Sequence, residues 1–140
     1  MRLFKWTAAR TVYLPDIDDE HRDIYHAADE LHQLVLAGAD ATAMRASASA
    51  LAARADEHFF HEERLMRAVH YPSFQWHKRQ HDTARKAVKR LALEIDSGDR
   101  AAALELLAFL SGWLKDHTAL TDRLMAAYLR NQQRSHAAAS

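Results

Sequence analysis

Five histidines and two carboxylates stand in four short motifs that lie far apart in the sequence. They are His21 in IDDEH, His58 and Glu62 in HFFHEE, His77 and His81 in HKRQH, and His117 and Asp122 in HTALTD. The chain has no cysteine, and a set of imidazoles and carboxylates suits iron, zinc or manganese rather than a soft-metal or cluster site. Seven ligands exceed what one tetrahedral ion takes, and they suffice for two ions that share carboxylates. We therefore predict a dinuclear metal site.

The elements that position these residues are predicted to be helices. Glycine and proline are scarce, and turn residues divide the chain into helical stretches near 17–37, 41–68, 74–96 and 100–130. Asp16 is the expected N-cap of the first helix, and Gly98 suits a left-handed C-cap. Connections this short make neighbouring helices antiparallel. The prediction is an all-α fold, an antiparallel up-down-up-down four-helix bundle with an N-terminal arm: one domain with arm 1–15, bundle about 16–130 and a frayed tail 131–140.

All five histidines fall within apolar seams that repeat every three or four residues along these helices. The fourth seam, for example, consists of Leu106, Leu110, Trp113, His117, Leu120 and Leu124. In an antiparallel bundle the motifs also meet at one level. Asp122 fits less well, because five residues are about 140° past a whole turn of α-helix, so spacing alone does not select it over Asp116.

The bulk composition excludes several classes of protein. Nineteen basic and nineteen acidic residues cancel, so no overall charge directs the chain to nucleic acid or anionic lipid. No apolar run reaches the roughly 18 residues of a membrane span, and the N-terminus does not resemble a signal peptide. We expect a cytoplasmic protein without a nucleic-acid or membrane partner.

The order of these motifs resembles that of the hemerythrin family, in particular its bacterial single-domain members. The order is a histidine after an acidic turn, then H-x-x-x-E, H-x-x-x-H and H-x-x-x-x-D. The resemblance covers roughly residues 4–125. It implies two non-heme iron ions, one bound by His77, His81 and His117 and the other by His21 and His58. Glu62 and Asp122 would bridge them together with an oxo or hydroxo group. In the family, dioxygen binds reversibly at the open position of the iron that has two histidines.

The resemblance also implies how the open position is lined. Ile24, Phe59 and Trp113 are expected to form its apolar walls. Thr118 stands where the family usually has isoleucine, and its hydroxyl either faces the pocket or bonds back to a carbonyl one turn earlier. No further acid or base is clearly placed there, which favours dioxygen binding as a carrier, store or sensor module rather than an enzyme. The alternatives are a di-iron oxidoreductase acting on peroxide or nitric oxide, and iron buffering.

The remaining histidines have no matched partner and are expected at the surface or rim. They are His26, His32, His61, His70 and His136. His61 and Glu62 begin like the zinc-protease motif H-E-x-x-H, but the final histidine is missing. Glu63 is expected to be solvated or to support a ligand. No glutamate has a histidine three residues later, so the ligand pattern of ferritin-like proteins is absent.

Overall fold

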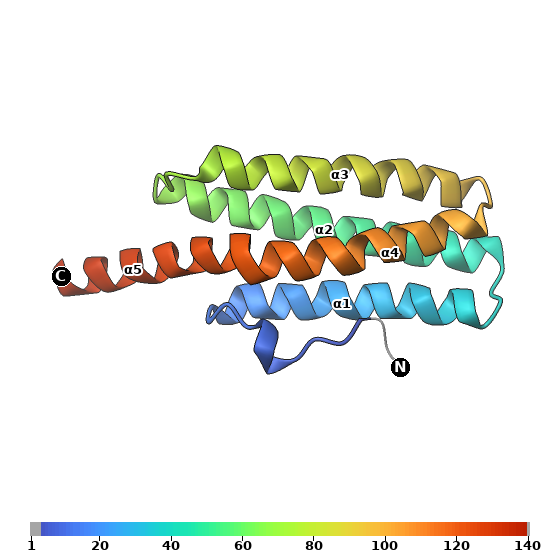
Figure 1. The fold of residues 1–140 in the computed structure, drawn as a ribbon, viewed down its shortest axis with the longest axis horizontal. Helices are drawn as coiled ribbons and strands as arrows, with labels where there is room; N and C mark the ends of the chain where they lie inside the picture. The colour runs from blue at the N-terminus through green and yellow to red at the C-terminus, as the bar shows by residue number, and fades with distance from the viewer. Residues whose placement is uncertain (1–3, 140) are drawn as a thin grey trace.

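The computed structural model describes residues 4–139, all of whose regular elements are helical (Figure 1). Four long segments build the bundle: α1 (Pro15–Leu36), α2 (Ala41–Ala68), α3 (Phe74–Asp96) and α4 (Arg100–Asp116). A π-helical turn, η2 (His117–Asp122), joins α4 directly to α5 (Arg123–Ala139), and the arm contains a short 3-10 turn, η1 (Ala8–Arg10). The predicted all-α fold is confirmed.

Neighbouring helices alternate in direction around the bundle, as predicted (Figure 1). α1 and α3 each pack between α2 and α4. The Asp40 carboxylate caps α2 by accepting a hydrogen bond from the Ala43 amide at 2.8 Å, and Asp99 caps α4 by accepting one from Ala102 at 3.2 Å. Gly98, with φ of +95°, ends α3 in the left-handed conformation expected for it.

The start of α1 differs from the prediction. Leu14 is the N-cap and Pro15 occupies the first turn, a position where the missing amide hydrogen of proline costs nothing. Asp16 therefore lies inside the helix. The buried Asp18 carboxylate instead accepts hydrogen bonds from the Val12 amide at 2.9 Å and from the Thr11 hydroxyl. These bonds hold the arm against the beginning of α1.

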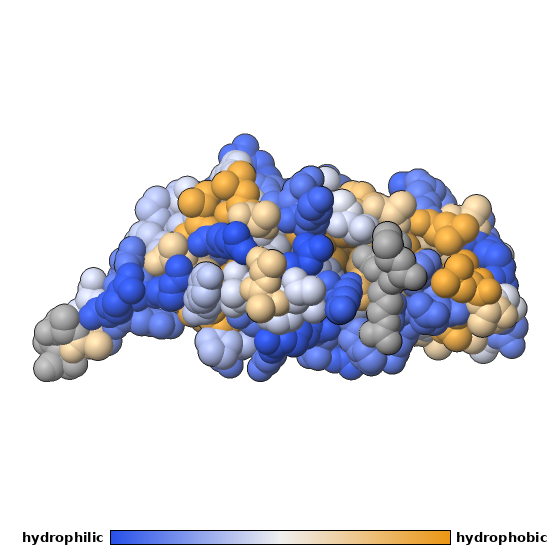
Figure 2. Space-filling view, turned by 60° about the horizontal axis from the view of Figure 1, so that its bottom comes forward, coloured by the Kyte–Doolittle hydropathy of each residue, from blue (hydrophilic) through white to orange (hydrophobic). Residues whose placement is uncertain are grey.

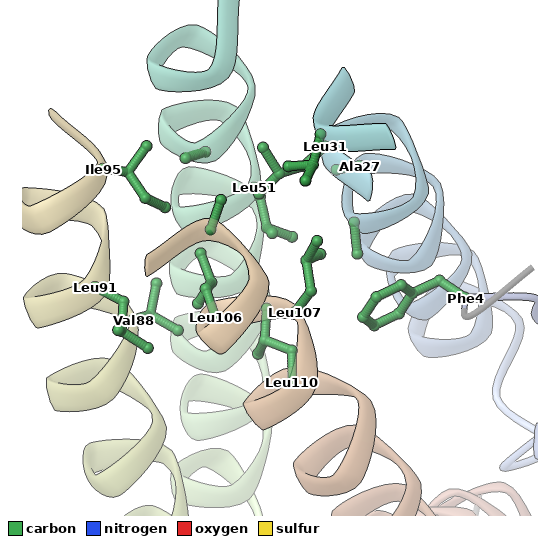
Figure 3. Packing of buried hydrophobic residues seen from close by; sticks show 14 of the residues in the cluster. Phe4, Ala27, Leu31, Leu51, Val88, Leu91, Ile95, Leu106, Leu107 and Leu110 are labelled. Carbon is green, nitrogen blue, oxygen red and sulfur yellow. The ribbon is translucent and has the colours of Figure 1, made fainter. Parts of the chain in front are cut away.

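One half of the bundle is an apolar core (Figure 3). Leu31 of α1, Leu51 of α2, Leu91 of α3 and Leu107 of α4 meet there, each at most 1% exposed. Burying each such side chain contributes about 1.5–3 kcal/mol. This core fixes the spacing of the four helices, and that spacing continues into the other half of the bundle, where the polar residues lie.

The predicted fourth seam is wrong beyond His117. Leu120 and Leu124 are 56% and 49% exposed, and Met125, Ala126 and Leu129 are buried instead. The cause is the π turn, whose i→i+5 hydrogen bonds insert one residue into the helical repeat. One extra residue rotates the following side chains by about 100°, so the apolar face after the turn shifts by one position.

Residues 131–139, in the segment expected as a frayed tail, are helical in α5, which extends past the end of the bundle (Figure 1). The side chains of residues 131–137 are exposed. No helix within residues 4–139 combines the length and apolarity that crossing a membrane requires.

Candidate metal centre

The seven side chains singled out by the sequence lie together in the half of the bundle next to the α2–α3 turn. They form two groups with ligand atoms within 4.8 Å of one another. The larger group, which we call the three-histidine group, consists of His77, His81, His117, Glu62 and Asp122. The smaller, the two-histidine group, consists of His21, His58, Glu62 and Asp122. Glu62 and Asp122 belong to both, and every member is at most 4% exposed.

Asp122 reaches the site because of the π turn. His117 and Asp122 are the first and last residues of η2. In a π turn residues five apart lie one above the other, and the Nε2 atom of His117 is 3.0 Å from Oδ1 of Asp122. In an uninterrupted α-helix Asp122 would have pointed away from His117. The sequence resemblance identified this residue, and helical spacing did not.

The Nε2 atoms of all five histidines face the two shared carboxylates. Oε1 of Glu62 is 3.0 Å from Nε2 of His81 and 3.2 Å from Nε2 of His77, and its Oε2 is 3.2 Å from Nε2 of His58. Oδ2 of Asp122 is 3.2 Å from Nε2 of His21. The imidazoles therefore present the same nitrogen to one interior point from four different elements.

Three residues outside this set accept hydrogen bonds from the opposite ring nitrogens. Glu20 lies 2.7 Å from Nδ1 of His58, Glu63 lies 2.8 Å from Nδ1 of His81, and the Gln80 side-chain carbonyl lies 2.8 Å from Nδ1 of His117. Gln80 can only accept with that oxygen, so the His117 proton stays on Nδ1. Such partners fix ring orientation and leave the Nε2 lone pair for a metal. Glu63 was expected either to be solvated or to support a ligand, and it contacts the ligand candidate His81. No sequence signal pointed to Glu20 and Gln80.

Many polar atoms at this point are buried without a hydrogen-bond partner among the described residues. They include Nε2 of His81, Nε2 of His117, Oε2 of Glu62 and both carboxylate oxygens of Asp122. Leaving such a group unsatisfied costs about 1–3 kcal/mol, and more when it is charged. Several orphaned donors and acceptors converging on one point fit a cation that would satisfy them together. The nitrogen and oxygen donors present match the preferences of iron, zinc and manganese.

The carboxylates and imidazoles perturb one another strongly. Burial raises the pKa of Glu62, but the positive charge and hydrogen bond of His58 outweigh it and hold that pKa well below its usual range. Burial likewise opposes charge on His58, but Glu62 and Glu20 overcome it and raise the pKa of His58 to about 10. Burial also opposes charge on His77, but the nearby carboxylates of Asp122 and Glu62 overcome it and raise the pKa of His77 to about 9. Without a metal, protons on these rings balance the buried carboxylates.

This balance predicts how the metal-free protein responds to pH. His58 and His77 bind protons more tightly in the folded state than at the ordinary pKa of 6.5. The unfolded state therefore binds fewer protons above pH 6.5, and the free energy of unfolding falls as pH rises. We expect the melting temperature of the chelator-treated protein to decrease steadily between about pH 6.5 and 9–10. A melting temperature that stays constant or rises across this range would contradict the proposed charge balance.

Phe59 and Trp113, both predicted to line the site, pack against its imidazoles, and Phe59 also lies 6.0 Å from the His58 ring. The Phe59 ring stacks on His81 with centroids 4.4 Å apart, and Trp113 stacks on His117 at 4.2 Å. Ile24 is 1% exposed and belongs to the apolar core. Thr118, which was also predicted to line the site, borders His21 in a small hollow.

The lining of the hollow beside His21 includes polar side chains that the sequence did not indicate. Trp6 and Arg10 of the arm, Tyr25 of α1 and Leu114 of α4 complete its lining with Thr118. Burial raises the pKa of Tyr25, so its hydroxyl stays protonated near neutral pH and can donate a hydrogen bond. Tyr25 is therefore a hydrogen-bond donor near His21 that the sequence did not indicate. The arm residues escaped detection because sequence spacing does not show where an irregular segment folds back.

The other histidines lie at the rim or surface, as predicted. His26 is exposed and pairs with Glu30 at 3.0 Å. His61 is partly exposed, and its Nδ1 atom lies 2.5 Å from Oε2 of Glu20, whose other oxygen contacts His58. His32 is partly buried, and His70 and His136 are exposed.

These features define a class of helical-bundle proteins that hold cations between their helices through histidines and carboxylates. The sequence matches the family described as the hemerythrin HHE cation binding domain over residues 13–129. The chain therefore belongs to the hemerythrin family. It is 25% identical to a bacteriohemerythrin of Ralstonia nicotianae over 129 residues, which are 92% of this chain and 90% of that protein.

Solved structures support the same assignment. A crystal structure of a hemerythrin mutant with a leucine-to-tyrosine substitution superposes with a TM-score of 0.82 and 25% sequence identity. The match covers 92% of this chain and 98% of that chain. A leucine-to-phenylalanine mutant matches with the same TM-score, identity and coverage.

Proposed function

We propose that this chain binds two iron ions, one in each group, and binds dioxygen reversibly at the two-histidine group. The observation that carries the proposal is the unequal division of ligands around two shared carboxylates. The three-histidine group offers five side chains, whereas the two-histidine group offers four. An ion in the smaller group has one protein ligand fewer, which favours the binding of an external ligand there. When bound, the pair of iron ions supplies the electrons that reversible dioxygen binding requires.

The residues of the chain have separate tasks in this proposal. Glu62 and Asp122 would bridge the ions and offset part of their charge. Glu20, Glu63 and Gln80 hold three of the imidazoles with Nε2 directed inward. Trp6 and Leu114 help to enclose the space beside His21, which limits access of bulk water. Such preorganisation stabilises the native fold around the metal.

An anaerobic titration tests the proposal. The protein is loaded with ferrous iron, its iron content is measured, and its optical spectrum is followed during oxygen addition and subsequent removal. We expect two irons per chain and recovery of the starting spectrum over repeated cycles. One iron per chain at saturation would contradict the dinuclear centre, and a spectrum that never recovers would contradict reversible binding.

A second candidate, an oxidoreductase that acts on peroxide or nitric oxide, is favoured by the hydrogen-bond donors that line the hollow. Thr118, Tyr25 and Arg10 line it beside His21, and hydrogen-bond donors near a reacting oxygen favour O–O cleavage or protonation over simple release. The same iron-loaded protein distinguishes the two functions. Sustained consumption of hydrogen peroxide or nitric oxide with an added reductant would support the enzyme. Reversible cycles without such consumption would support the binding protein.

A further inference from the structure

A second, outer pocket lies between the arm and the junction of α4, η2 and α5. Its volume is about 280 Å³. Three basic residues line it: Arg10 of the arm, Lys115 of α4 and Arg123 of α5. Thr7 and Thr118 add two hydroxyl donors, and no carboxylate lines the pocket.

The three cations have no acidic partner within residues 4–139. Arg10 lies over the Tyr25 ring at 5.4 Å, and Arg123 donates a hydrogen bond to the backbone carbonyl of Ala9. Arg22, which also holds the arm, differs, because it lies over Trp6 at 4.0 Å and pairs with Asp19 at 2.7 Å. Like charges gathered in one pocket repel each other, and a bound anion relieves that repulsion.

The outer pocket adjoins the metal centre through two shared residues. Arg10 and Thr118 also line the small hollow beside His21. The surface that carries the arm is largely hydrophilic, with separate hydrophobic patches (Figure 2). A positively charged pocket therefore opens on this surface, next to the hollow that borders His21 of the two-histidine group.

From the charge and size of this pocket we infer that it binds a small inorganic oxyanion. Arg10, Lys115 and Arg123 supply positive charge from three elements, and Thr7 and Thr118 supply neutral donors. A cavity of about 280 Å³ accommodates a phosphate-sized ion with several waters. The site requires no metal. An effect of the bound anion on ligand access to His21 would rest on the proposed function, whereas anion binding itself does not.

Nuclear magnetic resonance on the metal-free full chain tests the site directly. Inorganic phosphate is added at constant ionic strength, with chloride as the exchanged anion, and backbone amide shifts are followed. We expect saturable shifts confined to residues 7–10 and 115–123. The affinity should fall as ionic strength rises, because exposed charges are screened by salt. Shifts that do not saturate, or that centre on the histidine cluster, would overturn the inference.

Lys115 offers the cleanest variant, since it is exposed and its side chain makes no hydrogen bond or ion pair within residues 4–139. Lys115→Gln should weaken phosphate binding about threefold to fivefold, the effect of losing one exposed ionic contact. Lys115→Glu should abolish saturable binding. Lys86→Gln and Lys86→Glu are matched controls, because Lys86 is exposed on α3 and lines no part of this pocket. Equal weakening of phosphate binding by the Lys115 and Lys86 substitutions would show that net charge alone causes the effect, and it would overturn the proposed site.

Discussion

Glu62→Ala should remove metal from both groups, whereas His21→Ala should remove it from one. Glu62 lies between the groups, with one oxygen facing His77 and His81 and the other facing His58. His21 belongs to the two-histidine group alone. We therefore expect iron content to fall from two ions per chain to well below one in Glu62→Ala and to about one in His21→Ala. Elemental analysis of protein loaded under identical conditions measures both values.

The comparison needs variants that separate ligand loss from unfolding. Glu62→Gln keeps the volume of the side chain but replaces one carboxylate oxygen with an amide nitrogen that cannot bind a cation. Circular dichroism then shows whether the bundle is intact. His26→Ala removes an exposed histidine on the same helix as His21 and should leave iron content unchanged. Equal iron loss in Glu62→Ala and His21→Ala, with both folded, would contradict a shared bridge.

The fold was predictable because its signals are local and repeated. Asp40 and Asp99 are good N-caps placed directly before helical stretches, and Gly98 provides the left-handed position that ends α3. The apolar spacing of α1 and α3 continues through their histidines without interruption. Helical periodicity alone therefore places His21, His77 and His81 on inward faces.

Periodicity failed where the backbone departs from the α-helix. The π turn at His117–Asp122 turns Asp122 inward and Leu120 and Leu124 outward. A calculation at 3.6 residues per turn cannot anticipate this inserted residue. The insertion brings Asp122 to the side of the helix where His117 already lies, so one short segment supplies two side chains to the site. Only the complete pattern of the four motifs pointed to Asp122.

The supporting residues were missed for a different reason. Glu20 and Gln80 each lie one residue away from a metal-ligand candidate on their own helix, yet each contacts a histidine of a neighbouring element. Gln80 also accepts a hydrogen bond from the Thr121 hydroxyl at 2.7 Å and so links α3 to the π turn. Such pairings depend on the angle and rotation of packed helices. A single sequence carries no periodic signal for them.

Thr118→Ile should slow autoxidation of the oxygen-loaded protein by about tenfold, the effect of losing one hydrogen bond worth about 1.5 kcal/mol to a charged group. Thr118 is 4% exposed and lines the hollow beside His21. Among residues 4–139 its hydroxyl makes no hydrogen bond to the carbonyl one turn earlier, in contrast to Thr83, which donates to Arg79 at 3.0 Å. If dioxygen binds beside His21 as proposed, a free hydroxyl there would favour protonation and loss of reduced oxygen. Isoleucine removes that donor and fills space that water would need.

Two variants separate the donor from the space. Thr118→Val keeps the β-branched shape and removes only the hydroxyl, whereas Thr118→Ile also adds volume. Autoxidation is followed optically at equal iron content and at several pH values. If the hydroxyl is responsible, both variants slow the reaction and its acid dependence weakens. If water entry is responsible, only Thr118→Ile slows it. An unchanged rate in both variants would show that Thr118 has no contact with the ligand position, even though it borders His21.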